Sequence, residues 1–441
     1  MAGSKDDAAK QSQSAGPGKL PLELLANIHD RLEFLDRIAF ATVFAASGDD
    51  VLSFPTPWLH LPCDDKDKHP ATATLFSLAD RRAATVRAPD PALRDYVVLG
   101  SSHGWLATGD NQGQIHLVNP ATGEQHALPH IATMGVFVPG NDSRGYFSVS
   151  FRRFLTARFG GGPPFEDSRW GAEGHGGVTY LGGEDLRTRF YRKVVLSVGR
   201  RPGRHAAMLI LSESYGAPAF AAVEDGGAWR LGRSQDDVED AIHHDGRFHS
   251  VSYSGIVEAW ERDVESGAYT STAVAPRLTT GGEGMSSRKY LVAAPDGRLM
   301  VVVKNWTKER GYLWNKTWTC SFHVYVLGDD GQWKETRDIG DAALFIGLNN
   351  SLCVPRMRRP EIEAGCVYYT DDQLWEAALR KRNKDIKYRD DDDDDDDYVD
   401  IRPAGVYSLK DGTVKKIDAL GPQLYHGFTP TPPVWITPSI P

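Results

Sequence analysis

The sequence predicts a mainly β fold, namely a β-propeller of six four-stranded blades, with seven as the alternative count, preceded by a short α-helical motif. Three observations predict it. A unit of two hairpins recurs five times, and the total of 44 Gly and 26 Pro suits many tight turns and short strands. The helical pattern is confined to a short stretch near the N-terminus of the 441-residue chain. A pair of β-sandwiches is the structural alternative.

The repeated unit has two halves. The first half is a Gly-containing turn that leads into a strongly apolar strand, with copies HGWLAT, PGRHAAMLIL, DGRFHSVSY, DGRLMVVV and AGCVYYT. The second half is an apolar strand, another Gly turn and a polar strand, with copies IHLVNPATGEQHAL, AFAAVEDGGAWRL, VEAWERDVESGAYTS, FHVYVLGDDGQWKET and GVYSLKDGTVKKI. Glycine is favoured there because it adopts positive φ without steric cost. Two hairpins therefore make four antiparallel strands per repeat.

Successive four-stranded sheets are expected to stack radially, because one such sheet cannot bury both of its faces alone. Gly246 and Gly297 are 51 positions apart, close to the roughly 40–50 residues of known propeller repeats. A sixth blade is predicted from both chain ends. TLFSLADRRAATVRAP, residues 74–89, reads as its outer hairpin, and the C-terminal QLYHGFTPTPPVWITPS as its inner strands. This closure removes two exposed sheet edges.

The domain organisation follows from these patterns. Residues 1–19 are predicted to be a disordered tail, residues 20–50 the helical motif and residues 51–441 the propeller. Insertions are expected at about 155–178, which is rich in glycine, and at about 379–400. The second insertion holds eight consecutive aspartates after a basic stretch, so we expect a solvated, disordered loop there.

Charge and hydropathy narrow the function classes. The formal net charge is −9, and without the eight consecutive aspartates it is −1, which gives no support for nucleic-acid binding. The first residues lack the apolar core of a signal peptide, and no stretch reaches about 18 uninterrupted apolar residues, so no membrane contact is expected. The expected location is the nucleus, the cytoplasm or both.

No metal or cofactor is predicted. The four cysteines are scattered without a CxxC pair, which argues against a zinc site. His243, His244, Asp245 and His249 could supply metal ligands. However, neighbouring residues on a strand point to opposite faces, so we predict a solvated turn instead.

No catalytic residue is predicted either. Gly100-Ser-Ser-His-Gly matches G-x-S-x-G, the nucleophile elbow of α/β-hydrolases, which needs a helix after the serine. The following WLATGD reads as a strand, so a hairpin turn explains these glycines.

The tryptophans divide into two groups. Trp229, Trp260 and Trp333 fall at strand starts or interiors and are predicted to pack in the blade core. Trp170 and Trp306 are predicted to lie on loops, where they could touch a partner.

The N-terminal stretch carries the pattern of two amphipathic helices. Leu24, Ile28 and Leu32 are four positions apart and form one apolar stripe. Pro21 suits a helix start, and Asp36 suits the N-cap of a second helix that carries Phe40, Val43 and Phe44. Two helices of this size bury too little to be stable alone, so their apolar faces need a partner, either the propeller or another protein.

This stretch, LPLELLANIHDRLEFLDRIAFATV, resembles an F-box, the helical motif that docks a protein onto the Skp adaptor of SCF-type ubiquitin ligases. The resemblance implies that the adaptor is bound through Leu20, Pro21, Leu24, Leu25, Ile28, Leu32, Ile38 and Val43. One feature departs from the family pattern. The usual Cys and Trp-Arg ending of the second helix is replaced by Phe44-Ala-Ala-Ser-Gly, which removes a large aromatic side chain from the docking surface.

The downstream chain resembles the plant KIB-type β-propeller through GSSHGWLATGDNQGQIHLVNPATGEQHALP, CVYYTDD and PPVWITPS. The two resemblances together imply a non-enzymatic substrate receptor. The Skp-family adaptor would connect the chain to a cullin, and the propeller would hold a protein substrate whose identity the sequence does not give. Two alternatives stay open: a non-ligase interaction propeller with a degenerate F-box, and a propeller hydrolase or lyase with a site in the central channel.

Overall fold

The computed structural model of the chain divides into two compact units, Met1–Pro55 with Ile440–Pro441, and Thr56–Ser439. It describes residues 24, 27, 28, 31, 32, 36, 40, 56–61, 72–87, 96–138, 145–150, 153, 178–197, 205–212, 215–222, 227–234, 236–280, 287–309, 317–357, 359–374, 404–417 and 432–437. The tail predicted at 1–19 and nearly all of the two predicted insertions lie outside these residues. Within them, no helix is long and apolar enough to cross a membrane.

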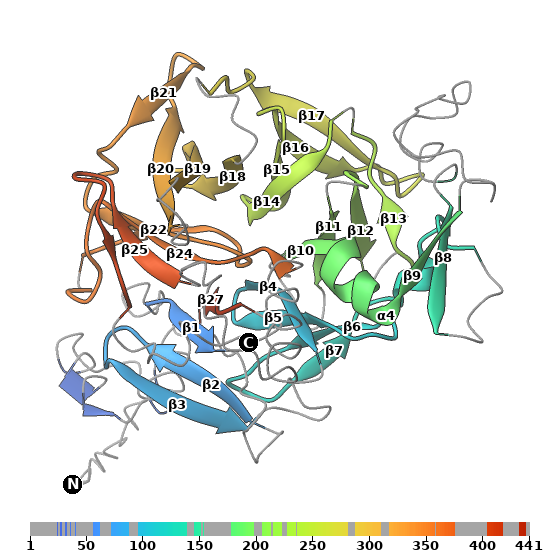
Figure 1. The fold of residues 1–441 in the computed structure, drawn as a ribbon, viewed down its shortest axis with the longest axis horizontal. Helices are drawn as coiled ribbons and strands as arrows, with labels where there is room; N and C mark the ends of the chain where they lie inside the picture. The colour runs from blue at the N-terminus through green and yellow to red at the C-terminus, as the bar shows by residue number, and fades with distance from the viewer. Residues whose placement is uncertain are drawn as a thin grey trace, which may run out of the picture. The chain divides into compact units, whose positions relative to one another are not determined.

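The second unit is a six-bladed β-propeller, which confirms the predicted fold class (Figure 1). Blade I consists of β27 (Val434–Ile436), β1 (Trp58–Leu61), β2 (Thr72–Ser77) and β3 (Arg82–Arg87). Blade II consists of β4 (Val97–Ser102), β5 (Trp105–Gly109), β6 (Ile115–Val118) and β7 (Gln125–Ala127). Blade III consists of β10 (Tyr191–Leu196), β11 (Ala206–Leu211), β12 (Pro218–Ala222) and β13 (Arg230–Leu231).

Blades IV to VI complete the ring. Blade IV consists of β14 (Val238–His244), β15 (Arg247–Ser252), β16 (Val257–Arg262) and β17 (Tyr269–Ala275). Blade V consists of β18 (Ser287–Ala293), β19 (Leu299–Glu309), β20 (Thr317–Leu327) and β21 (Trp333–Thr336). Blade VI holds, in spatial order, β23 (Leu352–Pro355), β22 (Ala342–Ile346), β24 (Cys366–Thr370), β25 (Ala404–Ser408) and β26 (Val414–Lys415). All ten predicted hairpin halves coincide with strands of blades II to VI.

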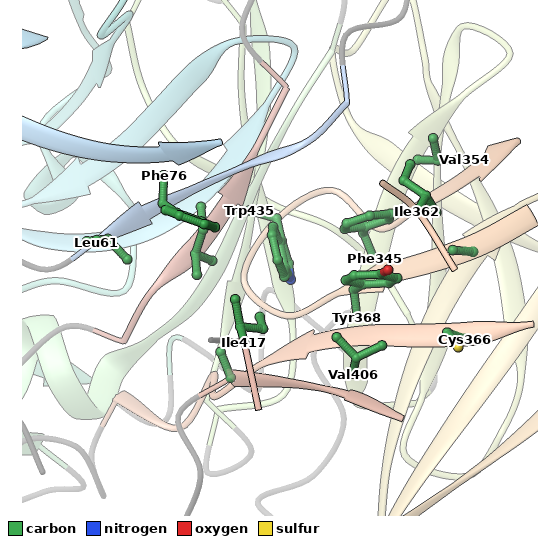
Figure 2. Close-up of a cluster of buried hydrophobic side chains, with 13 residues drawn as sticks. Leu61, Phe76, Phe345, Val354, Ile362, Cys366, Tyr368, Val406, Ile417 and Trp435 are labelled. Carbon is green, nitrogen blue, oxygen red and sulfur yellow. The ribbon is translucent and has the colours of Figure 1, made fainter. Parts of the chain in front are cut away.

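Strands from the two ends of this unit close the ring. β27 pairs with β1 in antiparallel register, Leu59 lying opposite Trp435, and the red strand lies beside the blue one in Figure 1. The Trp435 ring packs between blades I and VI, with its centroid 5.1 Å from that of Phe345 and 6.1 Å from that of Tyr368 (Figure 2). The prediction that strands from both chain ends form one blade is therefore confirmed. However, the C-terminal stretch contributes one described strand, and β1, which the sequence pattern did not reveal, supplies the next.

Blade VI departs from the predicted set of four antiparallel strands. β22 lies between β23 and β24, and it pairs with β24 in parallel, with Leu344 opposite Val367. The prediction of four antiparallel strands is wrong for this blade, because its first two strands form a hairpin of their own beside β24.

A further hairpin lies outside the blades. β8 (Tyr146–Ser150) pairs with β9 (Val178–Gly182), and the Gly-rich insertion predicted at about 155–178 falls between these two strands in the sequence. Three short helical segments accompany the strands: η4 (Ile131–Thr133), α4 (Gly183–Asp185) and η6 (Leu186–Phe190).

The G-x-S-x-G match is a β-hairpin, as predicted. Its turn places His103 and Gly104 at φ values of 49° and 83° between β4 and β5. Gly100 is required for another reason: a Cβ added there would lie 2.2 Å from the carbonyl oxygen of Val194 on β10. This glycine lets the first strands of blades II and III approach each other closely.

Tryptophans connect neighbouring blades. The indole N–H of Trp229 donates to the carbonyl of Pro129 at 2.7 Å, and that of Trp333 donates to the carbonyl of Pro276 at 2.7 Å. The predicted core role holds for Trp229 and Trp260, which are buried, whereas Trp333 is half-buried. Trp306 lies in β19 and not on a loop, which corrects its prediction.

Candidate functional site

The N-terminal segment is helical at four of its described positions, Leu24, Asn27, Ile28 and Arg31. Leu24 and Ile28 lie one helical turn apart and expose 50% and 38% of their surface. Leu32, the third member of the predicted stripe, is half-buried in a bend. Two large apolar side chains therefore face outward on one helical face.

The second predicted helix is represented by Asp36 and Phe40, both helical. Asp36 lies within the helix, whereas the sequence predicted it as the N-cap. The other residues that the F-box resemblance assigns to adaptor binding lie outside the described part of the chain: Leu20, Pro21, Leu25, Ile38 and Val43.

Charged residues line the first half of three successive inner strands of the propeller. The pairs occupy corresponding positions with alternating sign: Arg192-Lys193 in β10, Glu239-Asp240 in β14 and Arg288-Lys289 in β18. Asp371-Asp372 follow β24 in blade VI. We call these four pairs the charge dyads. The sequence interpretation missed them, although like-signed pairs at equivalent repeat positions were visible in it.

The strongest contact among the dyads joins blades III and IV. Lys193 Nζ lies 2.6 Å from Asp240 Oδ1, and both side chains are fully buried. Asp240 Oδ2 also accepts the backbone N–H of Leu291 at 2.9 Å, so one carboxylate links blades III, IV and V. Burial lowers the pKa of Lys193 and raises that of Asp240, while the attraction within the pair opposes both shifts.

Glu239 is the second bridging carboxylate. It lies 3.3 Å from Lys289 Nζ and 3.9 Å from the Arg192 guanidinium. Lys289 also donates to the carbonyl of Tyr253 at 2.8 Å, and Arg192 lies over the Tyr253 ring. Burial raises the pKa of Glu239, and the neighbouring cations oppose that rise.

The last dyad contact joins blades V and VI. Arg288 Nε lies 2.7 Å from Asp372 Oδ2, and the guanidinium stacks over Tyr290 at 5.3 Å. Burial favours the neutral form of Arg288 and is the largest single influence, but Asp372, Tyr290, Glu239 and Tyr253 together outweigh it and raise the pKa of the guanidinium. The carboxylates Glu239, Asp240 and Asp372 are thus all ion-paired, an arrangement suited to holding blades together rather than to exchanging protons.

A turn of blade VI lies across the channel. Residues 347–351, here called the channel turn, connect β22 to β23. Asn350 N donates to the carbonyl of Ser101 in blade II at 2.6 Å, and Asn350 Oδ1 accepts the backbone N–H of His243 in blade IV at 3.1 Å. Leu348 is fully buried. Blade VI therefore contacts blades that are not its neighbours, so the protein's own chain occupies the axis at this level.

The histidines considered as metal ligands do not form such a site. In the described part of the chain, no group of three or more His, Cys, Asp or Glu side chains is placed to hold a metal ion. His243 and His244 are half-buried at the end of β14, so the prediction of a solvated turn is wrong for them. It is right for Asp245 and Gly246, which are exposed in the turn.

Comparison with known proteins gives one family match. The model of the KIB1-4 β-propeller matches residues 75–408, and no curated protein matches the chain. Among solved structures, similarity extends to a Lactobacillus plantarum protein, at 12% identity, 65% of this chain, 83% of that chain and a TM-score of 0.28. The Bacteroides ovatus xyloglucan PUL GH43B is similar at 8% identity, over 65% of this chain and 46% of that chain, with a TM-score of 0.27. Apo AztD of Citrobacter koseri is similar at 10% identity, over 63% of this chain and 84% of that chain, with a TM-score of 0.23.

The family match is extensive. It runs from β2 in blade I to β25 in blade VI, and so takes in strands of all six blades, all four charge dyads and the channel turn. Its extent includes the five predicted repeats up to β25 and the VYYTDD segment that carries Asp372. The chain belongs to the KIB1-4 β-propeller family.

Proposed function

We propose that this protein is the substrate receptor of an SCF-type ubiquitin ligase. The N-terminal helices dock onto a Skp-family adaptor, which connects them to a cullin, and the propeller binds a protein substrate. Ubiquitin transfer then follows from proximity within the assembly. The family membership supports the coarser part of this proposal, a propeller with a protein-interaction role.

The observation that carries the ligase proposal is the outward position of Leu24 and Ile28, at 50% and 38% exposure. Large apolar side chains in adjacent turns of one helix are the pattern by which a helix fills a partner's groove. Since 50% and 38% of these side chains remain to be covered, completing their burial contributes roughly 1–3 kcal/mol to association.

The ion-paired dyads favour a binding role over the catalytic alternative. A propeller hydrolase or lyase needs a carboxylate free to exchange a proton with a bound molecule. Glu239, Asp240 and Asp372 each contact a buried cation instead. The surface of the ring then remains for substrate binding, as expected of a scaffold that presents variable loops.

Adaptor capture tests the proposal. The tagged full-length chain is expected to retain a purified Skp adaptor, and the double variant Leu24→Asp/Ile28→Asp to lose at least tenfold of that retention, because two buried charges would replace the apolar contacts. Asn27→Asp is the matched control, since it adds a charge to the same helix at an exposed position between them.

Two results would contradict the ligase role. One is the absence of adaptor retention by the unmodified chain, which would leave a propeller with a degenerate F-box. The other is equal retention by both variants.

Capture from proteasome-inhibited plant cells, comparing the full chain with one that starts at Val51, then identifies the substrate: it should bind both chains and accumulate with the shorter one.

A further inference from the structure

Six histidines of blades II, III and IV make ring contacts with one another. The His103 ring, in the β4–β5 turn, meets the His243 ring of β14 edge to face, with centroids 6.5 Å apart. Blades II and IV are not neighbours, so this contact passes blade III. The ring centroids of His126 and His205 lie 6.3 Å apart and each lies 5.2 Å from that of Trp105, while those of His244 and His249 lie 6.2 Å apart.

The channel turn joins the same two strands as the His103–His243 pair. Asn350 bonds to the carbonyl of Ser101, two residues before His103, and to the backbone N–H of His243 itself. Blades II and IV are therefore joined by two separate contacts, the one between the imidazoles and the one through the channel turn. A change that separates the imidazoles also strains both Asn350 hydrogen bonds.

The surroundings of the pair favour neutral imidazoles. Burial lowers the pKa of His103 to about 4, helped by His243 and His205. Burial also lowers the pKa of His243 to about 4, helped by His249 and His244. The carboxylates nearby face other rings: Glu124 lies beside His126 and His205, and Asp245 beside His249 together with the cation Arg247.

We propose that the His103–His243 contact is an acid-sensitive latch that holds the channel turn, so that acidification releases residues 347–351 from blades II and IV. When the latch opens, both imidazoles enter water and take up protons that they cannot hold while in contact. Each proton taken up favours the open form. The opening equilibrium of the channel turn therefore shifts with pH.

Hydrogen exchange tests the latch. Exchange of peptides that cover the channel turn is followed by mass spectrometry at about pH 7.5 and pH 5, with rates corrected for intrinsic pH dependence. A shift from about 4 in the closed form to the ordinary 6.5 in the open form predicts on the order of 30-fold more opening at pH 5 for each histidine. Peptides from β19 report global unfolding and should change less than those of the turn.

Three variants decide the outcome. His103→Asn keeps a residue that tolerates positive φ, and with His243→Gln it should reduce the pH response of the channel turn to less than about threefold. His60→Gln is the control: His60 is a buried histidine of β1 with a pKa lowered to a similar value, and its removal should leave the response of the turn unchanged. The proposal fails if the unmodified turn opens equally at both pH values, if turn and β19 open together, or if the double variant keeps the full response.

Discussion

Lys193 on β10 and Asp240 on β14 form a 2.6 Å ion pair between two blades, with both side chains withdrawn from water. Removing one partner leaves the other charge buried without compensation. We expect Asp240→Asn to lower the free energy of unfolding by about 3–5 kcal/mol. Replacing both, as Lys193→Met/Asp240→Leu, should recover part of that loss, because no uncompensated charge remains although the Leu291 N–H loses its acceptor. Urea denaturation followed by fluorescence measures the difference.

An exposed pair provides the comparison for that experiment. Arg247 and Glu261 lie 2.8 Å apart, with about half of each side chain in water. Glu261→Gln should change the free energy of unfolding by less than about 1 kcal/mol. Equal losses for Asp240→Asn and Glu261→Gln would show that the dyads do not hold the blades together.

Gly100 permits the close approach of blades II and III. A Cβ at this position would meet the Val194 carbonyl at 2.2 Å, and backbone cannot move aside as a flexible side chain can. We expect Gly100→Ala to cost about 1–3 kcal/mol of unfolding free energy. Gly135→Ala, where nothing lies within 4 Å of the added carbon, should stay within about 0.5 kcal/mol of the unmodified protein. A neutral Gly100→Ala variant would refute the predicted steric conflict.

The indole N–H groups of Trp229 and Trp333 connect adjacent blades through proline carbonyls. Phenylalanine retains much of the apolar contact but cannot donate the hydrogen bond. Trp229→Phe should cost about 1–3 kcal/mol because the contact is buried, and Trp333→Phe less than about 1.5 kcal/mol because its ring is half-buried. Thermal unfolding of the two variants side by side checks the order, and the reverse order would contradict it.

His60 gives the fold a pH dependence of its own. Burial lowers the pKa of His60 from 6.5 to about 4. Since the folded-state value lies below the unfolded one, this contribution to stability is complete above pH 6.5 and is lost as the pH falls toward 4. His60→Phe removes it, so between about pH 7 and pH 5 the variant should lose roughly 2 kcal/mol less than the unmodified protein.

The control for that measurement is Thr272, an exposed residue of β17 that does not titrate. Thr272→Ala should keep the pH dependence of the unmodified protein. Denaturant titrations at several pH values give the comparison, and parallel curves for His60→Phe and the unmodified chain would count against the prediction.

The sequence predicted those parts of the fold that are encoded locally. Each hairpin half carries its own turn glycine and apolar strand, so the strands of blades II to VI could be placed. β1 was missed because its four residues, WLHL, lack a turn signal and find their partner, β27, near the other end of the chain. The parallel pairing of β22 with β24 was missed for a similar reason, since parallel partners need no short connecting turn.

The candidate sites likewise divide into one that can be read from a local pattern and others that join residues far apart in the sequence. An amphipathic stripe such as Leu24 and Ile28 is a property of one helix, and its spacing can be read directly. The contact between Lys193 and Asp240 joins residues 47 positions apart, and Asn350 meets His243 across 107 positions. Only the closed ring brings such residues together, so local pattern gives no sign of the channel turn or of the histidine latch.

The alternating sign of the charge dyads restricts which blade can stand beside which. Basic β10 meets acidic β14, which meets basic β18, so exchanging any two of these neighbours, or duplicating one, would set like charges against each other in a dry interface. Homologous repeats within one chain run the risk of assembling out of sequence while the polypeptide folds. Here the buried charges counter that risk, because opposite charges meet between these blades only when the blades stand in their native order around the ring.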